Sequence, residues 1–520
     1  MKYTSDENLK PVLLTVFALF ILRLVFVAFG PIDLSPDEAH YWEWSRYLDL
    51  SYYSKPPLVA WLNYISTSIF GNTHVGVRFF SCLALSVLSF VAYLIAHQAA
   101  GQKAGWFALL LINLTPEFAA GGLMMTPDVP SLTFWALGLY MLTKIDFEAA
   151  DVPYRKFVIL GVFLGFAGLA KYTTALFYPM LGLYLLLSKQ RRAWLLKPHI
   201  YIAGFVSLVM QAPVLYWNYM HDFIGLKHVM GQSAGSSDFS GFKSLGNFLG
   251  GQLGVVSPVT FILLLCAWGA VACLLWRGRA VKAQTQTQKQ KTLEILWYFS
   301  APIFLAFLIK STGSKVQPNW PVLSIYGGFI LLAIWVSAAG KGLRRTFIAG
   351  LIFSTLLTVI SHDTFIVRKV LKMAGSDVVV PFKRDPLKPA LGWRGLGQAI
   401  SAKVDPVLNG IEPIILMTRY QTASELSFYM KGNPKIIYVN PGYRRQNQYD
   451  LWPWPEGMGE KPVVYIRENG VIEPFIFNAF ENCAHLGAVA SRRDNVLMRQ
   501  ANVYLCFGYK GLERPRPERY

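Results

Sequence analysis

Charged side chains follow the first apolar stretch of the chain, in PIDLSPDEAHYWEWSRYLDLSYYSKPPLVAWLNY (31–64). Asp37 and Glu38 are adjacent carboxylates, and Lys55 precedes a stiff Pro-Pro pair that limits where its ammonium points. A carboxylate can accept a proton from a hydroxyl, and an ammonium can stabilise phosphate oxygens. Asp37 also suits the N-cap of the helix that follows Pro36, and taken alone this structural role is as well supported as a chemical one.

Three further segments add acidic and basic groups between apolar stretches. Each charge taken singly is typical of a loop, but together they form a set of acids and bases. The set comprises Asp128 in TPDVPS (126–131), His221, Asp222, Lys227 and His228 in YWNYMHDFIGLKH (216–228), and Lys310 and Lys315 in KSTGSKVQPNW (310–320).

The composition indicates the setting of these residues. The chain has 520 residues, of which 53% are hydrophobic and 15% charged, whereas a soluble globular protein carries about 25% charged residues. Most of the surface must therefore face lipid. The formal net charge of +19 does not indicate nucleic-acid binding, because Lys and Arg occur in short clusters between apolar runs.

Eleven apolar runs are long enough to approach the thickness of the hydrocarbon core, about 30 Å, as helices. If the N-terminus is cytoplasmic, nearly every basic cluster falls in a cytoplasmic loop, as the positive-inside rule requires. The expected spans lie near 11–30, 76–97, 104–121, 129–145, 156–170, 173–189, 199–217, 254–276, 293–310, 321–338 and 346–361.

This topology places the charged segments described above on one side of the membrane. The external segments are 31–75, 122–128, 218–250 and 311–320, together with the short link at Lys171. Charge on this side runs against the general bias, so it needs another reason. A common site on the external face would supply that reason.

About 160 residues follow the last span, also outside, and their pattern differs. Alternating strand and helix patterns indicate a small α/β domain. Cys483 and Cys506 lie in it, where a disulfide is possible but not indicated by spacing. The expected strands are EPIILMT (412–418), KIIYVN (435–440), KPVVYI (461–466) and NVYLCF (502–507), with a helix at ASELSFYM (423–430).

An acid with several cations at headgroup level suits the transfer of a sugar from a lipid phosphate. Such transfer needs a base to deprotonate the acceptor and cations to stabilise the departing phosphate. The lipid chain can lie between apolar helices. Because the sugar arrives already activated, no nucleotide-binding fold is needed, and the sequence contains no Walker-type or dinucleotide glycine motif.

SPDEAHYWEWS, SKPPLVAWLN and TPDVPS together resemble the membrane glycosyltransferases of the GT-C type. More narrowly, they are similar to bacterial relatives of the protein O-mannosyltransferases and of the lipid A aminoarabinose transferase, in glycosyltransferase family 39. The resemblance implies a polytopic helical membrane part (1–361) with about 11–13 spanning helices and a periplasmic α/β domain (362–520). It extends to GLAKYTTALFYP (168–179), VLYWNYMHDFIG (214–225), KVQPNWP (315–321) and RRQNQYDLW (444–452).

The resemblance implies an inverting transferase with a polyprenyl-phosphate donor such as undecaprenyl phosphate. Asp37 matches the family's first-loop acid, the expected base, and Asp128 matches a second acid that helps to shape the acceptor site. Lys55 matches the lysine of the K-P-P motif, expected at the donor phosphate.

One position departs from the pattern. Aminoarabinose transferases carry an acid just before that lysine, which helps to bind a structural metal, and here the position is Ser54. We therefore expect no required metal and no other cofactor, and the narrow aminoarabinose assignment is weakened. A different site, in which His221 and His228 join Asp37, stays open as an alternative.

Other residues complete the expected site around the donor and the acceptor. Those expected to assist at the phosphate are Lys315, Lys227 and Arg78, and those expected to contact acceptor or sugar are Glu38, His221, His228 and Tyr53. In the external domain, Arg444, Arg445 and Trp452 either contact sugar or phosphate, or pack the domain against the membrane part.

The expected location is the bacterial inner membrane, with a cytoplasmic N-terminus and a periplasmic C-terminal domain. The acceptor is expected to be lipid A, another glycan or a protein, and nucleic acid is not expected. Two alternatives share the topology: a transporter or lipid flippase, and an O-antigen-type polymerase or ligase. Against a transporter, most charges avoid the middle of the spans, Arg23 and Lys171 being partial exceptions.

Overall fold

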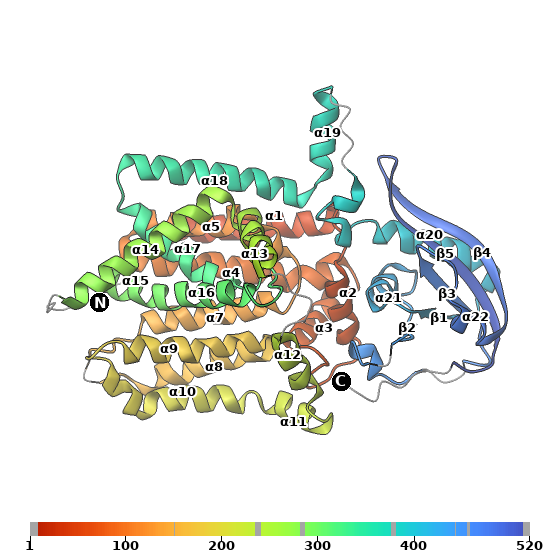
Figure 1. Cartoon of the computed structure of the whole chain (residues 1–520), viewed down its shortest axis with the longest axis horizontal. Helices are drawn as coiled ribbons and strands as arrows, with labels where there is room; N and C mark the ends of the chain where they lie inside the picture. The colour runs from red at the N-terminus through yellow and green to blue at the C-terminus, as the bar shows by residue number, and fades with distance from the viewer. Residues whose placement is uncertain are drawn as a thin grey trace.

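The computed structural model describes residues 9–149, 151–234, 241–280, 287–375, 381–442, 444–454 and 458–512. Figure 1 shows a bundle of long helices with roughly parallel axes, and a part that contains a β-sheet at one end of the bundle. The helices that build the bundle are α1 (Lys10–Phe29), α4 (His74–Ala100), α5 (Gln102–Leu114), α7 (Asp128–Thr143), α8 (Tyr154–Ala170), α9 (Phe177–Leu186), α10 (Pro198–Val209), α14 (Pro258–Ala280), α15 (Gln288–Tyr298), α16 (Ala301–Ser311), α17 (Val322–Ser337) and α18 (Lys341–His362).

Five helices of the described chain are long and apolar enough to cross a membrane, or up to seven if each of two bent pairs is one span. Each of the eleven predicted runs coincides with helical structure, but several of these helices are short. The 16-residue α7, at about 1.5 Å per residue, spans only about 24 Å. It nevertheless packs along α4 and α8, inside the bundle. The central helix is α17, which is buried along almost its whole length.

Further helices cover the end of the bundle that faces the sheet. They are α2 (Pro36–Ser45), α3 (Leu58–Phe70), α6 (Pro116–Ala119), α11 (Ala212–Met220), α12 (Ile224–Ala234), α13 (Gly241–Val256) and α19 (Phe365–Met373). Figure 1 shows α2 and α3 at the junction between the bundle and the sheet-containing part.

Helix α2 begins with a capping box, in which Ser35 accepts a hydrogen bond from the Glu38 backbone and Glu38 accepts one from the Ser35 backbone. Ser35 is thus the N-cap, and the capping role considered for Asp37 is wrong. The aromatic side chains of α2 face protein and not a lipid headgroup layer, because Trp42 and Trp44 are fully buried and α2 packs on α21 (Tyr420–Tyr429).

The C-terminal part is an α/β structure with a five-stranded sheet in the order β2-β1-β3-β5-β4. β1 is parallel to β2 and β3, whereas β3, β5 and β4 are antiparallel neighbours. The strands are β1 (Ile414–Met417), β2 (Ile436–Tyr438), β3 (Val463–Glu468), β4 (Phe480–Arg493) and β5 (Val496–Tyr509), with helices α20 (Trp393–Leu408), α21 and α22 (Pro474–Phe477).

A disulfide joins Cys483 of β4 to Cys506 of β5, which face each other across the hairpin. The sequence had left this bond open. The four predicted strands all exist, and the structure adds β4 and α20 to them.

Polar contacts join the sheet-containing part to the segment 31–75, which links α1 to α4. Asp33 accepts hydrogen bonds from the Trp393 backbone at 2.8 Å and is ion-paired with Arg394, and Arg46 donates to Ser427 at 2.9 Å. The His74 ring meets the Tyr429 hydroxyl at 2.6 Å. These contacts hold the C-terminal part over α2 and α3, where the predicted acids lie.

Candidate active site

Asp37 stands in the first turn of α2, where Ser35 already serves as the cap. Solvent reaches its carboxylate, although protein surrounds it on most sides. No hydrogen bond or ion pair from the described residues engages this carboxylate. Partial burial raises the pKa of Asp37; Lys55 opposes the shift, and Glu38 and Asp128 add to it. A carboxylate that is reachable, unengaged and more basic than usual is suited to accept a proton.

Lys55 lies just before α3, in the segment between α2 and α3. Burial lowers the pKa of Lys55, and the neighbouring charge of Lys171 lowers it further, while Asp128 and Asp37 raise it. Lys55 is therefore close enough to all three charges to interact with each of them. Its half-buried ammonium is available to an incoming anion, because no described residue forms an ion pair with it.

Asp128 begins α7, and its carboxylate lies 2.5 Å from the ammonium of Lys171, at the end of α8. Asn319 donates a weak hydrogen bond to the other oxygen of Asp128 at 3.5 Å. Glu117 of α6 interacts electrostatically with both members of the Asp128–Lys171 pair.

Lys171, Asn319 and Glu117 surround Asp128, although the sequence predicted no role for them. Lys171 and Asn319 belong to motifs quoted above, GLAKYTTALFYP and KVQPNWP, and those motifs were the available signal. Glu117 follows an apolar helix with no such motif, so nothing in the sequence singled it out.

Tyr53 and His228 lie beside this cluster. Their ring centroids are 4.8 Å apart. Burial lowers the pKa of His228 to about 4, and the charges of Lys55 and Arg444 contribute to the shift. Beside these two cations, the imidazole is thus uncharged at neutral pH.

The segment around Arg444 closes over Tyr53 from the C-terminal part. The Tyr53 backbone donates to Gln448 at 2.7 Å, and the Tyr53 hydroxyl donates to the Arg445 carbonyl at 2.7 Å. The Trp452 ring packs on Tyr47 of the first loop at 4.7 Å. This segment therefore packs the domain against the first external loop, and it also brings Arg444 near the cluster.

Glu38 and Arg78 form a buried pair beside the open cluster. Arg78 Nε and Nη2 each lie 2.7 Å from a different oxygen of Glu38, and Arg78 also donates to the carbonyls of Ile32 and Asp33. Burial alone would raise the pKa of Glu38, but Arg78 and hydrogen bonds from Ser35 and Met125 outweigh it and lower the pKa. This geometry gives both residues a structural task, in place of the sugar and phosphate contacts expected from sequence.

Within the described residues, three other predicted residues form no hydrogen bond or ion pair with Asp37, Lys55 or Asp128. His221 stacks on Trp217 with ring centroids 4.0 Å apart, and its Nδ1 lies 2.9 Å from the Trp217 carbonyl. Lys227 and Lys315 are exposed, and neither forms an ion pair with a described residue. Within the described ranges, no group of three or more His, Cys, Asp or Glu side chains has the geometry to hold a metal ion.

The cluster brings together groups from four separate parts of the chain: Asp37, Lys55, Asp128 and Lys171. It combines an accessible carboxylate, a second carboxylate held by a lysine, and a cation with which no described residue forms an ion pair. Such a set can accept a proton from a hydroxyl while it stabilises negative charge on a leaving oxygen.

Comparisons with known proteins agree with this chemistry. Residues 54–217 match the family described as dolichyl-phosphate-mannose-protein mannosyltransferase. The chain is 29% identical over 366 residues to the lipid A galacturonosyltransferase RgtD of Rhizobium johnstonii, which covers 68% of this chain and 72% of that protein. It is 27% identical to an undecaprenyl phosphate-alpha-4-amino-4-deoxy-L-arabinose arabinosyl transferase of Proteus mirabilis, over 58% of this chain and 55% of that protein.

Among solved structures, the crystal structure of ArnT from Cupriavidus metallidurans bound to undecaprenyl phosphate superposes with a TM-score of 0.63. The match covers 95% of this chain and 98% of that one, at 15% identity, and so establishes a shared fold. The apo form of the same enzyme gives a TM-score of 0.62. With this fold and these relatives, the chain is a membrane glycosyltransferase that is similar to the protein O-mannosyltransferases and the lipid A aminoarabinose transferases, and it shares the fold of the GT-C type.

Proposed function

We propose that this enzyme moves a sugar from a polyprenyl-phosphate donor, such as undecaprenyl phosphate, to lipid A on the external face of the bacterial inner membrane. The observation that carries the proposal is the convergence of Asp37, Lys55 and Asp128 from three external segments. The names of the relatives support both substrates, one being a lipid A transferase and another an undecaprenyl-phosphate-sugar transferase.

The reaction is a single displacement at the anomeric carbon. The acceptor hydroxyl oxygen forms a bond to that carbon while the bond from the carbon to the phosphate oxygen breaks, and configuration inverts. The hydroxyl proton passes to Asp37, whose raised pKa makes it a stronger base than an ordinary carboxylate. An acceptor that is itself a phosphate is already ionised, and then Asp37 only orients it.

Lys55 receives the charge that develops on the departing polyprenyl phosphate. Burial and the charge of Lys171 lower the pKa of Lys55, which means that they disfavour its charged form. A phosphate that binds beside Lys55 supplies the negative charge that stabilises this ammonium. Asp128, held by Lys171 at 2.5 Å, orients the acceptor or the sugar. Tyr53 and His228, whose rings contact each other near Lys55, form an uncharged wall of the sugar site.

The C-terminal domain belongs on the periplasmic side in this proposal. The Cys483–Cys506 disulfide supports this side, because structural disulfides persist in oxidising compartments such as the periplasm. The site lies at the same end of the bundle as this domain, since Gln448 and Arg445 contact Tyr53.

A donor assay tests the proposal. Purified enzyme in liposomes receives labelled undecaprenyl-monophosphate sugar or a diphosphate-linked glycan, with lipid A as acceptor. We expect label on lipid A from the monophosphate donor alone. Lys55→Met should reduce kcat/KM roughly 100-fold or more, whereas Lys227→Met, which removes an exposed lysine outside the cluster, should not.

Two outcomes would favour the alternatives instead. Transfer from the diphosphate-linked glycan would indicate a polymerase or ligase. Movement of the labelled donor across the bilayer without transfer would indicate a flippase. The relatives described above are named as transferases and support neither alternative.

A further inference from the structure

Helix α19 (Phe365–Met373) differs from the rest of the bundle in direction. It begins three residues after His362, the last residue of the spanning helix α18. Figure 1 shows α19 roughly perpendicular to α18, at the end of the bundle that faces the sheet. Because the bundle axes follow the membrane normal, α19 runs along the plane of the external membrane surface.

The sequence of α19, FIVRKVLKM, separates apolar and basic side chains by face. At about 100° per residue, the five apolar residues after Phe365 form one continuous arc, in the order Met373, Ile366, Val370, Val367 and Leu371. The three basic residues Arg368, Lys372 and Lys369 occupy the remaining arc. Short helices with an apolar face and a Lys/Arg-rich face are typical of segments that lie in a membrane interface.

The apolar face of α19 has little cover from the described protein. Val370 is 57% exposed and Met373 is 88% exposed. Within the described ranges, α19 makes only a small contact with α18, the helix that precedes it. Lys369 and Lys372 are also exposed, and no described residue forms an ion pair with them. The apolar face can thus contact the acyl region of a membrane interface while the basic face contacts anionic headgroups.

The start of α19 is nevertheless held firmly. Phe365 is buried beneath the guanidinium of Arg493, 4.3 Å from the ring centroid, and Arg493 also pairs with Asp363 at 2.7 Å. Thr364 donates to Asp385 at 2.8 Å. Since Arg493 belongs to β4, these contacts fix the direction of α19 relative to both the bundle and the external domain.

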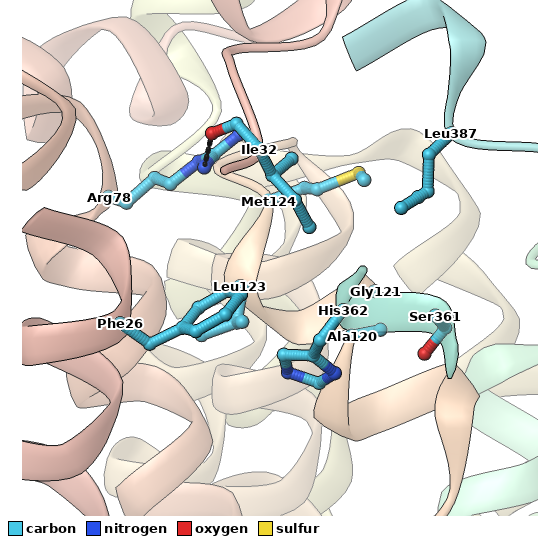
Figure 2. Close-up of a pocket in the computed structure, with 10 residues that line it drawn as sticks. All are labelled: Phe26, Ile32, Arg78, Ala120, Gly121, Leu123, Met124, Ser361, His362 and Leu387. Carbon is cyan, nitrogen blue, oxygen red and sulfur yellow. Dashed lines mark hydrogen bonds between the residues drawn. The ribbon is translucent and has the colours of Figure 1, made fainter. Parts of the chain in front are cut away.

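Two neighbouring features agree with a position at the headgroup level. Lys383, Arg384 and Lys388 follow and are all exposed, so positive charge accumulates on a side of the membrane that the positive-inside rule leaves poor in it. Beside the end of α18 lies a cavity of about 90 Å³, lined largely by apolar side chains that include Phe26, Leu123 and Leu387 (Figure 2).

We propose that α19 is an interfacial helix that binds the anionic, phosphate-bearing lipid headgroups of the external leaflet. Lys369 and Lys372 contact the headgroup phosphates, while Ile366, Val370 and Met373 enter the acyl boundary. The helix thereby sets the level of the lipid surface relative to the external domain. This surface is separate from the donor and acceptor contacts proposed above.

Site-directed spin labels in nanodiscs test the position of the helix. Full-length enzyme with Cys82, Cys266 and Cys273 replaced by Ala, and the disulfide kept, receives a label at Val370→Cys or at Lys369→Cys. In nanodiscs that contain phosphatidylglycerol, the label at 370 should collide more often with lipid-soluble oxygen, and the label at 369 more often with a water-soluble nickel chelate. Dominant nickel collisions at both positions would overturn the proposal.

The lipid charge is tested with the label at 370. Lys369→Gln with Lys372→Gln should reduce the ratio of inserted to free helix roughly 30-fold, because each lysine near an anionic surface favours it about fivefold. The unsubstituted helix in phosphatidylcholine nanodiscs should behave like this double variant.

Lys341→Gln with Arg345→Gln, which removes two charges at the opposite end of α18, is the matched control and should change nothing. Equal insertion in both lipids, unaffected by the lysine substitutions, would refute binding of anionic headgroups. The readout does not depend on sugar transfer, so failure of the proposed function would leave this inference standing.

Discussion

The buried Glu38–Arg78 pair allows a structural role to be separated from a catalytic one. Arg78→Met removes the guanidinium that contacts both oxygens of Glu38 at 2.7 Å. Glu38 has no exposed surface, and its remaining hydrogen bonds come from the Met125 backbone, the Ser35 backbone and the Ser35 hydroxyl. The variant therefore leaves a buried charge without its counter-ion.

Removal of one partner from a buried ion pair typically costs about 3–5 kcal/mol. The carbonyls of Ile32 and Asp33 also lose their donor, so we expect the upper part of this range. The double variant Glu38→Leu with Arg78→Met leaves no isolated charge and should recover much of the loss.

Thermal unfolding in detergent, followed by tryptophan fluorescence, measures the effect. Because the pKa of Glu38 is lowered below its ordinary value of 4.5, the pair should stabilise the fold above that pH. This contribution should disappear as the pH falls through the lowered pKa. Arg78→Met should reduce the melting temperature by several degrees at neutral pH. Unchanged melting together with weakened donor binding would refute the structural role and restore Arg78 to the phosphate site.

Three further predictions concern the site and the external domain. Asp128→Asn should move the acid limb of the pH profile of kcat/KM to lower pH, because Asp128 raises the pKa of Asp37. Lys55→Met should move the same limb to higher pH, because Lys55 lowers that pKa. An acid limb that stays in place in both variants would exclude Asp37 as the titrating base. Lys171→Met should lower kcat/KM about tenfold, with recovery in Lys171→Arg, since the pair with Asp128 is partly exposed; equal losses in both variants would contradict a charge-based role. Replacement of Cys483 and Cys506 by Ala should destabilise the domain by about 3 kcal/mol, given their separation of 23 residues. Differential scanning calorimetry with and without reductant measures this change, and reductant should shift the unsubstituted protein alone.

The fold could be predicted well where hydrophobic pattern decides the structure. Apolar runs became helices and the β-rich runs became β1, β2, β3 and β5, because burial imposes these patterns locally. β4 escaped prediction since its sequence, FENCAHLGAVASRR, mixes small and polar residues on an edge strand exposed along much of its length. Its pairing depends on β5, including the disulfide, and not on its own apolar pattern.

The site could be predicted only in part. Loop motifs singled out Asp37, Lys55 and Asp128, and the structure brings their charges within reach of one another. The partners of these groups depend on tertiary contacts that no local pattern reveals. Glu38 and Asp37 are adjacent, yet one is sealed against Arg78 and the other is open, because successive residues of a helix face different directions. The buried aromatic face of α2 likewise depends on α21, almost 400 residues later in the chain.

The most direct test of the account is the rate of sugar transfer by Asp37→Asn. The substitution keeps size and removes the base, so kcat should fall about 10²–10⁴-fold, with melting temperature and donor binding unchanged. Asp222→Asn, at an exposed external acid outside the cluster, should retain full activity. Near-normal transfer by Asp37→Asn, or an equal loss in both variants, would contradict the role of Asp37 as the base of this reaction.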